Sequence, residues 1–205
     1  MEFDNYSSHL LVFDKIFAGF EIKKVLEFGM GRYSTTFFVE HCESVTSVEQ
    51  ESQQWYETMK AEINSPNWYH FFQSDPRLLF EHFDAANEKF DLVFSDGAAQ
   101  TRSLVANLAM ERNVPWVVLH DAEKIWYYRW NLLNIPSNYT RFNFRHREGM
   151  NKVTTVLANS HQTDLERWII PDHDRILQAY SSPGQPVIEV QYDRVGDSSG
   201  RLDRV

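Results

Sequence analysis

The sequence predicts an α/β fold: a doubly wound, mostly parallel seven-stranded sheet with a C-terminal antiparallel hairpin strand and helices on both faces. Five short apolar runs alternate with segments of helical spacing, a glycine turn follows the first run, and two extended runs come last. Because parallel strands end at one edge of such a sheet, the residues that follow the strands are the candidates for a site.

The predicted elements follow one another with short connections. Strands are expected at 24–28, 45–49, 67–73, 90–95, 115–119, 139–144 and 152–158, with a hairpin joining the last two. Helices are expected at 9–20, 34–41, 50–63 and 101–112, and in a short segment that Pro76 opens. Ser7 and Ser8 precede the first helix, and either of them can cap it.

The chain of 205 residues is long enough for one domain. Residues 1–160 are predicted to form that domain, N-terminal helix included. A further helix is expected over 160–180, and residues 181–205, with their prolines and glycines, are expected to form an extended arm or a loose tail. The segment 161–205 is therefore not predicted to be an independent domain.

Charge and cysteine content narrow the class of protein. The formal net charge of −9 opposes binding to nucleic acid or anionic lipid, so a small-molecule or protein substrate is expected, without nucleic acid or membrane partners. The single cysteine, Cys42, excludes an intramolecular disulfide and fits a reducing compartment. No long apolar run and no basic leader are present, so a cytoplasmic location is expected. A homodimer remains open.

The turn after the first predicted strand has the pattern of a nucleotide-cofactor site. Gly29 and Gly31 allow a tight turn and a close approach of ligand to backbone, and the following helix start offers N–H groups to an anion. Glu49 lies 20 residues after Gly29, at the end of the second strand, where a carboxylate can accept hydrogen bonds from ribose hydroxyls. The combination predicts a cofactor with a ribose and an anionic group.

The stretch Glu27-Phe28-Gly29-Met30-Gly31, together with the order of the strands, resembles the class I S-adenosylmethionine-dependent methyltransferases over about residues 20–160. The family motif is acid-x-Gly-x-Gly, and Glu27 supplies the acid. Ser34 lies where a nicotinamide-binding Rossmann domain needs its third glycine, which counts against a nicotinamide-dependent oxidoreductase. That oxidoreductase and a non-catalytic binding or assembly protein with a degenerate methyltransferase fold are the two alternatives.

The resemblance implies a contact with S-adenosylmethionine for ten residues: Glu27 near the methionine amino group, Gly29, Met30 and Gly31 beneath the cofactor, Ser34 and Thr35 facing its carboxylate, Glu49 on the ribose, Ser74 and Asp75 at the adenine, and Asp96 at the methionyl end or the substrate. Structural roles compete with these assignments. Glu27 can cap a backbone turn, Glu49 can be a solvated strand end, and Asp75 can cap the helix that Pro76 opens.

The ends of the fourth and fifth strands carry the candidate catalytic residues Asp96, His120 and Asp121. Their placement resembles that of the metal-dependent small-molecule O-methyltransferases, which implies Mg²⁺ held by Asp96 and Asp121. Ala122 stands where those enzymes usually offer a third ligand. Three interpretations stay open: a metal site, substrate binding or general-base catalysis without metal, and a structural role.

The residue types at the end of the fourth strand separate subclasses of methyltransferase. The Asn/Asp-Pro-Pro-Tyr/Phe signature of enzymes that methylate nucleic-acid amino groups is missing, so base methylation of that kind is not expected. The resemblance to the small-molecule O-methyltransferases implies a small-molecule acceptor that is methylated at oxygen. Aromatic residues after the fifth strand, Trp126, Tyr127, Tyr128 and Trp130, form either a wall for a flat acceptor or part of the core.

Overall fold

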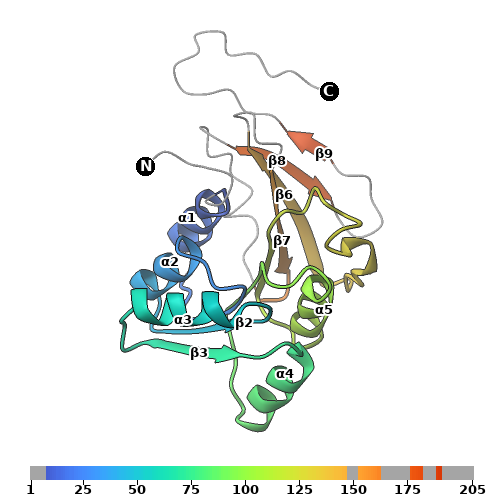
Figure 1. Cartoon of the computed structure of the whole chain (residues 1–205). Helices are drawn as coiled ribbons and strands as arrows, with labels where there is room; N and C mark the ends of the chain where they lie inside the picture. Colours follow the sequence, from blue (N-terminus) through green and yellow to red (C-terminus); the bar gives the residue numbers. More distant parts are fainter. Residues whose placement is uncertain (1–7, 147–151, 163–175, 182–187, 191–205) are drawn as a thin grey trace, which may run out of the picture.

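The computed structural model describes residues 8–146, 152–162, 176–181 and 188–190 (Figure 1). The helices are α1 Leu10–Gly19, α2 Ser34–His41, α3 Gln53–Glu62, α4 Pro76–Ala85, α5 Arg102–Glu111 and the short 3₁₀ helix η1 Trp130–Leu132. The strands are β1 Lys24–Phe28, β2 Ser44–Glu49, β3 Trp68–Phe72, β4 Leu92–Ser95, β5 Trp116–Leu119, β6 Tyr139–His146, β7 Val153–Asn159, β8 Ile176–Ser181 and β9 Ile188–Val190. All seven predicted strands are confirmed.

The strands form one sheet in the order β3-β2-β1-β4-β5-β7-β6-β8-β9. The pairs within β1 to β5 are parallel, and β7 lies antiparallel between β5 and β6. Among the seven predicted strands, β7 alone runs opposite to the others, as expected from the hairpin. The carboxyl ends of β1, β2, β4 and β5 therefore meet at one edge of the sheet.

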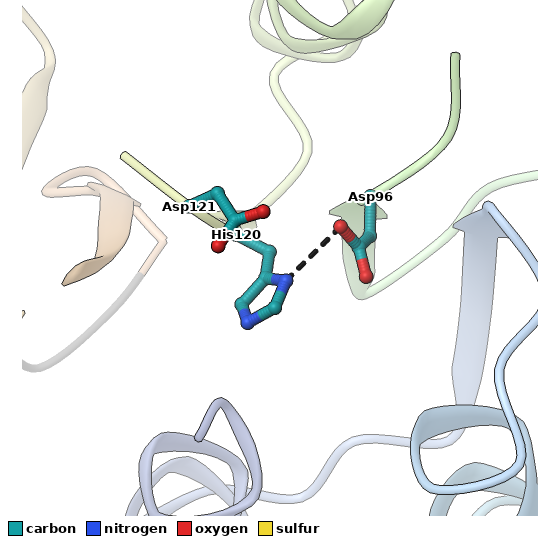
Figure 2. Close-up of side chains that lie close together, drawn as sticks. All are labelled: Asp96, His120 and Asp121. Atoms are coloured by element: carbon teal, nitrogen blue, oxygen red, sulfur yellow. Dashed lines mark hydrogen bonds and ion pairs between the residues drawn. The ribbon is translucent and has the colours of Figure 1, made fainter. Parts of the chain in front are cut away.

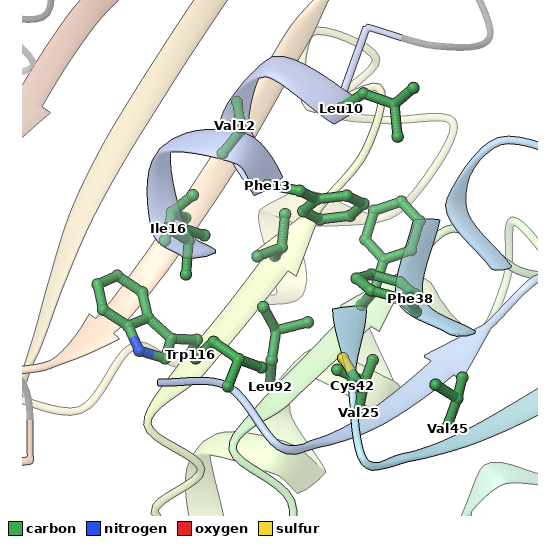
Figure 3. Close-up of a cluster of buried hydrophobic side chains, with 14 of the residues drawn as sticks. Leu10, Val12, Phe13, Ile16, Val25, Phe38, Cys42, Val45, Leu92 and Trp116 are labelled. Carbon is green, nitrogen blue, oxygen red and sulfur yellow. The ribbon is translucent and has the colours of Figure 1, made fainter. Parts of the chain in front are cut away.

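Two hydrophobic cores lie on opposite faces of the sheet. Side chains of α1, α2 and α3 pack on one face, where Phe13 and Phe38 belong to one buried cluster with strand residues such as Val25 and Leu92 (Figure 3). Side chains of α4 and α5 pack on the other face, against Leu26 and its neighbours. The alternation of Val25 and Leu26 between the two cores follows from the two-residue period of a strand. Both faces are buried, which explains the apolar character of the central strands.

The structure differs from the prediction at two places near the ends of the chain. The helix predicted over 160–180 is wrong for 176–180, which form β8 together with Ser181 beside β6, and β9 extends the sheet beyond it. The rest of the predicted helix and arm, at 163–175, 182–187 and 191–205, lies outside the described residues. At the other end, Ser8 is not the N-cap residue of α1: that position belongs to His9, whose side chain makes no capping hydrogen bond.

None of the helices in the described part of the chain has both the length and the apolar character needed to cross a membrane.

Candidate active site

Glu27 is fully buried at the end of β1, and three hydroxyl groups surround it. Its Oε2 atom accepts hydrogen bonds of 2.6 Å from Thr35 Oγ1 and of 2.6 Å from Ser47 Oγ. Burial raises the pKa of Glu27 to about 7, although the neighbouring hydroxyl groups of Ser34, Ser47 and Thr35 act in the opposite direction. The hydroxyls predicted to face the cofactor's carboxylate are thus directed to this glutamate.

The other carboxylate oxygen of Glu27 is unusual. Oε1 is buried and has no hydrogen-bond partner among the described residues. Buried polar atoms in folded proteins nearly always have a partner, so an exception at the turn between β1 and α2 calls for an explanation. A donor from a ligand or from water satisfies this oxygen without any change in the protein.

The two glycines of the turn have different physical roles. Gly29 has a φ of 93°, and a Cβ atom there would lie 2.5 Å from the backbone carbonyl carbon of Asp96. Only glycine fits this position, because the β1 turn packs directly on the end of β4. A Cβ atom at Gly31 would lie 2.8 Å from Ser34 Oγ, the end of a side chain that can rotate. Gly31 is therefore the less constrained of the two.

Polar contacts also hold the rest of this turn in place. The backbone N–H of Gly31 donates to Thr35 Oγ1 over 3.0 Å. Met30 is buried, and its carbonyl accepts a hydrogen bond of 2.7 Å from Trp55 Nε1 of α3. Because α2 and α3 both contact the turn, its backbone is ordered before any ligand arrives.

Glu49 ends β2 next to this turn and is nearly buried. Its Oε1 accepts hydrogen bonds from the backbone N–H groups of Glu51 and Ser52, at 2.9 and 3.1 Å. These contacts hold the carboxylate at the strand end, as a ribose-binding acid requires, and they also stabilise the turn into α3. The structure is thus compatible with both roles weighed for Glu49.

Gln50 is a buried residue of this edge that the sequence analysis missed. Its Oε1 accepts hydrogen bonds from Ala98 N and Thr101 Oγ1, at 3.0 and 3.1 Å, and its Nε2 lies 3.4 Å from the Ser74 carbonyl oxygen. The side chain thereby links the loops that follow β2, β3 and β4. In the sequence, only its position next to Glu49 indicated that Gln50 could belong to the site.

Asp75 lies at the N-cap of α4 and caps it. Its Oδ1 accepts a hydrogen bond of 3.0 Å from Arg77 N. The structure thus shows the structural role that was weighed against an adenine contact. Ser74 beside it contributes its carbonyl to Gln50, and an adenine contact for either residue stays a prediction.

His120 and Asp96 form a hydrogen-bonded pair at the ends of β5 and β4 (Figure 2). The Nδ1 atom of His120 lies 3.0 Å from Asp96 Oδ1, and its Nε2 atom lies 3.0 Å from Ser8 Oγ. Burial lowers the pKa of His120, but Asp96 and Asp121 outweigh it, so the pKa is raised above its usual value. Burial raises the pKa of Asp96, yet His120 and Arg102 hold it well below its usual range. The pair is therefore strongly coupled.

Asp121 has a left-handed backbone conformation, with a φ of 53° that aspartate tolerates better than most residues. Its Oδ1 contacts the ammonium of Lys152, and its Oδ2 accepts a hydrogen bond of 3.0 Å from Tyr128 Oη. Burial raises the pKa of Asp121, but His120 and Lys152 together lower it by more, so the pKa lies below its usual value. Asp121 is thus an ionised carboxylate with partners on both oxygens.

Arg102 connects Asp96 to Asp121, and the sequence analysis missed it. It is buried at the start of α5, where Nη2 lies 2.8 Å from Asp96 Oδ1 and Nη1 lies 3.9 Å from Asp121 Oδ2. The guanidinium also donates to the carbonyls of Gly97, Asp96 and His120 and lies 3.7 Å from the centre of the Tyr128 ring. Nothing in the sequence pattern distinguished this arginine from one on a solvated helix.

Asp96, His120 and Asp121 meet the geometric requirement for a metal site, since one ligand atom from each lies within 4.8 Å of the others. Their hydrogen bonds and ion pairs do not fit a divalent ion. Asp96 Oδ1 contacts both His120 and Arg102, and both oxygens of Asp121 have cationic or hydroxyl partners. An ion would have to displace two cations of the chain itself, so these residues do not form a Mg²⁺ site as they stand.

Of the four aromatic residues after β5, two belong to the core and two stay candidates for a wall against a flat acceptor. Tyr128 and Trp130 are buried in the core beside α5. Trp126 and Tyr127 are 81% and 68% exposed, respectively, and stay candidates for contact with an acceptor. Exposure therefore restricts a possible aromatic wall to these two residues.

The sheet order identifies the class of fold. A nicotinamide-binding Rossmann sheet has the parallel order 3-2-1-4-5-6, whereas here an antiparallel β7 lies between β5 and β6. The chain has the fold of the class I S-adenosylmethionine-dependent methyltransferases, as the comparisons with solved structures also show. No protein-family model matches the sequence, and no curated protein matches it.

Three solved structures illustrate the likeness. An O-methyltransferase from Bacillus cereus in complex with SAH is 14% identical, with a TM-score of 0.58 over 75% of this chain and 80% of that one. The O-methyltransferase TomG from Streptomyces achromogenes, in complex with SAM, is 15% identical, with a TM-score of 0.55 over 76% and 79%. The N-methyltransferase NodS from Bradyrhizobium japonicum, in complex with SAH, is 13% identical, with a TM-score of 0.51 over 74% and 85%. Since these include O- and N-methyltransferases, the fold does not define the acceptor atom.

Proposed function

We propose that the protein is an S-adenosylmethionine-dependent methyltransferase that acts on a small molecule at oxygen. The observation that carries the proposal is the buried Glu27 Oε1, which has no hydrogen-bond partner among the described residues. A carboxylate with one such oxygen, at the turn where this fold binds its cofactor, fits the positively charged amino group of the methionine moiety.

The residues around the turn fit the rest of the cofactor. When bound, S-adenosylmethionine supplies a methyl group already activated on a sulfonium, so the protein has to align the acceptor and exclude water. Glu49 holds a carboxylate at the end of β2 for the ribose hydroxyls, and Gly29 keeps the turn free of a side chain. Gln50 ties the neighbouring loops together, so that this edge keeps its shape before the cofactor enters.

His120 supplies the base that an acceptor hydroxyl needs. Asp96 bonds to Nδ1, which places the proton of the neutral imidazole on that nitrogen and directs the lone pair of Nε2 toward the acceptor. In the structure, Ser8 Oγ lies 3.0 Å from Nε2, at hydrogen-bond distance for a hydroxyl. In our proposal the acceptor hydroxyl would take the position of Ser8 and would give its proton to Nε2, while bound S-adenosylmethionine would supply the methyl group.

Oxygen is the favoured target because a base is present. A hydroxyl has to lose a proton during methyl transfer, whereas a neutral amine can attack with its lone pair and release its proton afterwards. A small-molecule acceptor is favoured over nucleic acid because the formal net charge of −9 opposes binding to phosphates.

Isothermal titration with S-adenosylhomocysteine (SAH) tests the proposal, with NAD as the rival ligand. We expect roughly micromolar affinity for SAH and no binding of NAD. Glu49→Gln keeps an oxygen for the amides of Glu51 and Ser52 but loses the charge, so we expect the affinity to fall on the order of tenfold while the fold is retained. Absence of SAH binding to the wild type would favour a non-catalytic protein with a degenerate fold.

A further inference from the structure

We propose that the acidic end of β4 and β5 works without a divalent ion, because Arg102 lies between Asp96 and Asp121 and Lys152 neutralises Asp121 from its other side. This inference rests on the proposed methyl transfer. At that site, positive side chains of the protein would balance the charge of the two carboxylates and of the acceptor oxygen.

The two carboxylates have the arrangement expected around a cation. They follow neighbouring parallel strands, and one oxygen of each lies within 4.8 Å of the other and of a nitrogen of His120. Carboxylates this close repel one another unless a positive charge lies between them. The guanidinium of Arg102 provides that charge, since it lies 2.8 Å from Asp96 Oδ1 and 3.9 Å from Asp121 Oδ2.

Arg102 is held in this position by more than its ion pairs. Its donors reach three backbone carbonyls at the ends of β4 and β5, and its flat face packs on Tyr128. A guanidinium with this many fixed contacts cannot leave without exposing several buried acceptors. The arginine therefore behaves as a permanent part of the site.

Lys152 completes the charge balance from the other side of Asp121. Lys152 comes just before β7, next to Val153, which joins this stretch of chain to the 121–123 loop. The N–H of Val153 donates to Glu123 Oε2 over 2.9 Å, and its carbonyl accepts a hydrogen bond from the N–H of Ala122. These contacts aim the ammonium at Asp121 and leave it 3.6 Å from Glu123 Oε1. Its side chain is only 15% exposed, in contrast to 46% for nearby Lys124.

An ammonium differs from a metal ion in what it offers an acceptor. It carries a single charge and three N–H donors, and two of these directions point to Asp121 and Glu123. Lys152 is thus a positioning residue that holds the carboxylates of Asp121 and Glu123.

Binding of Mn²⁺, followed by the loss of the free-ion signal in electron paramagnetic resonance, tests the proposal on the intact protein. We expect no uptake by the wild type at this site. Lys152→Met removes the ammonium and leaves the carboxylates, so Mn²⁺ should bind on the order of tenfold or more tightly than to the wild type. Lys152→Arg should restore the wild-type behaviour, and Asp121→Asn added to Lys152→Met should abolish the gain.

Lys124→Met is the matched control, because Lys124 lies near the same carboxylate but is exposed; we expect less than a twofold change. If Lys152→Met does not fold, Lys152→Gln serves the same comparison. The proposal is overturned by wild-type uptake of Mn²⁺ that Asp121→Asn abolishes, and equally by Lys152 variants that gain no affinity. SAH titration in the presence of a chelator reports separately on the proposed function, so the two can fail independently.

Discussion

His120 and Asp96, which follow two neighbouring strands, are joined by a hydrogen bond of 3.0 Å between Nδ1 and Oδ1. The aspartate is held ionised by Arg102, and its negative charge raises the pKa of the imidazole. The same bond selects the tautomer of the imidazole. One contact therefore determines both the basicity and the direction of the proposed base.

Replacing Asp96 by Asn keeps the shape of this contact and removes its charge. We expect the pKa of His120 to fall, because burial then acts without the opposing carboxylate of Asp96. The measurement is the titration of the His120 Cε1 proton by NMR in the wild type and in Asp96→Asn. Once an acceptor is known, the lower limb of its pH–rate profile should move in the same direction, and His120→Gln should lower kcat by about 10²–10⁴-fold.

Ser8→Ala serves as the control for this experiment. It removes the neutral partner of Nε2 and leaves the charged partner of Nδ1, so we expect a smaller change in the pKa of His120 than Asp96→Asn produces. An equal pKa in the wild type and in Asp96→Asn would show that the carboxylate does not tune this histidine.

The buried Glu27 makes stability depend on pH. Its pKa is raised from 4.5 to about 7 in the folded protein, so the folded state holds this proton more tightly than the unfolded state. Protonated Glu27 therefore adds roughly 3 kcal/mol to the free energy of unfolding. This contribution is fully present below pH 4.5 and is lost as the pH rises through about 7. Urea unfolding of the wild type and Glu27→Gln at pH 5 and pH 8 measures this difference. A pH dependence that is the same in both proteins contradicts the prediction.

Protonation of Glu27 also affects the proposed cofactor site. The ionised carboxylate attracts an ammonium group more strongly than the neutral acid does, so the affinity for SAH should rise between pH 6 and pH 8, across the raised pKa of about 7. Titration calorimetry at several pH values measures it. In Glu27→Gln this rise should disappear, while an unchanged profile would separate the glutamate from the ligand.

Gly29 should be the least replaceable residue of the turn. An added Cβ atom would lie 2.5 Å from the Asp96 backbone, and the positive φ disfavours any other residue. We expect Gly29→Ala to cost about 1–3 kcal/mol from the backbone conformation alone, with further loss from the clash. Gly31→Ala should cost less because Ser34 can rotate, and Gly19→Ala, with nothing within 4 Å of its Cβ, is the neutral control. Chemical denaturation ranks the three, and a Gly29→Ala protein as stable as Gly19→Ala contradicts the packing argument.

Asp75 caps α4 in the structure, and it is also predicted to contact the adenine of the cofactor. Asp75→Ala should lower the free energy of unfolding by about 1 kcal/mol, whereas Asp75→Ser keeps a capping oxygen and should stay near the wild type. Serine is too short for the adenine contact, so we expect it to weaken SAH binding without loss of stability. Unchanged affinity in Asp75→Ser would leave only the capping role.

The predicted strands agree with the structure because their signals are local. The period of apolar residues, together with the glycine and proline positions, depends on neighbours within one or two turns of chain. The cap of α4 by Asp75 and the start of that helix at Pro76 could be predicted for the same reason. The helix expected over 160–180 was wrong for 176–180 because pairing with β6 decides the conformation of that segment, and this pairing joins residues far apart in the chain.

The sequence by itself determined the alternation of strands and helices, the glycine turn, and the presence of acids at the ends of β1 and β2 and just after β4 and β5. Only the tertiary structure decided which charges meet. Arg102, Lys152 and Ser8 reach Asp96, Asp121 and His120 from separate elements, and electrostatic contacts of this kind depend on distance in space and on burial. A carboxylate after a strand therefore predicts a site, while its partners determine whether that site holds a metal ion, a proton or a cation of the chain.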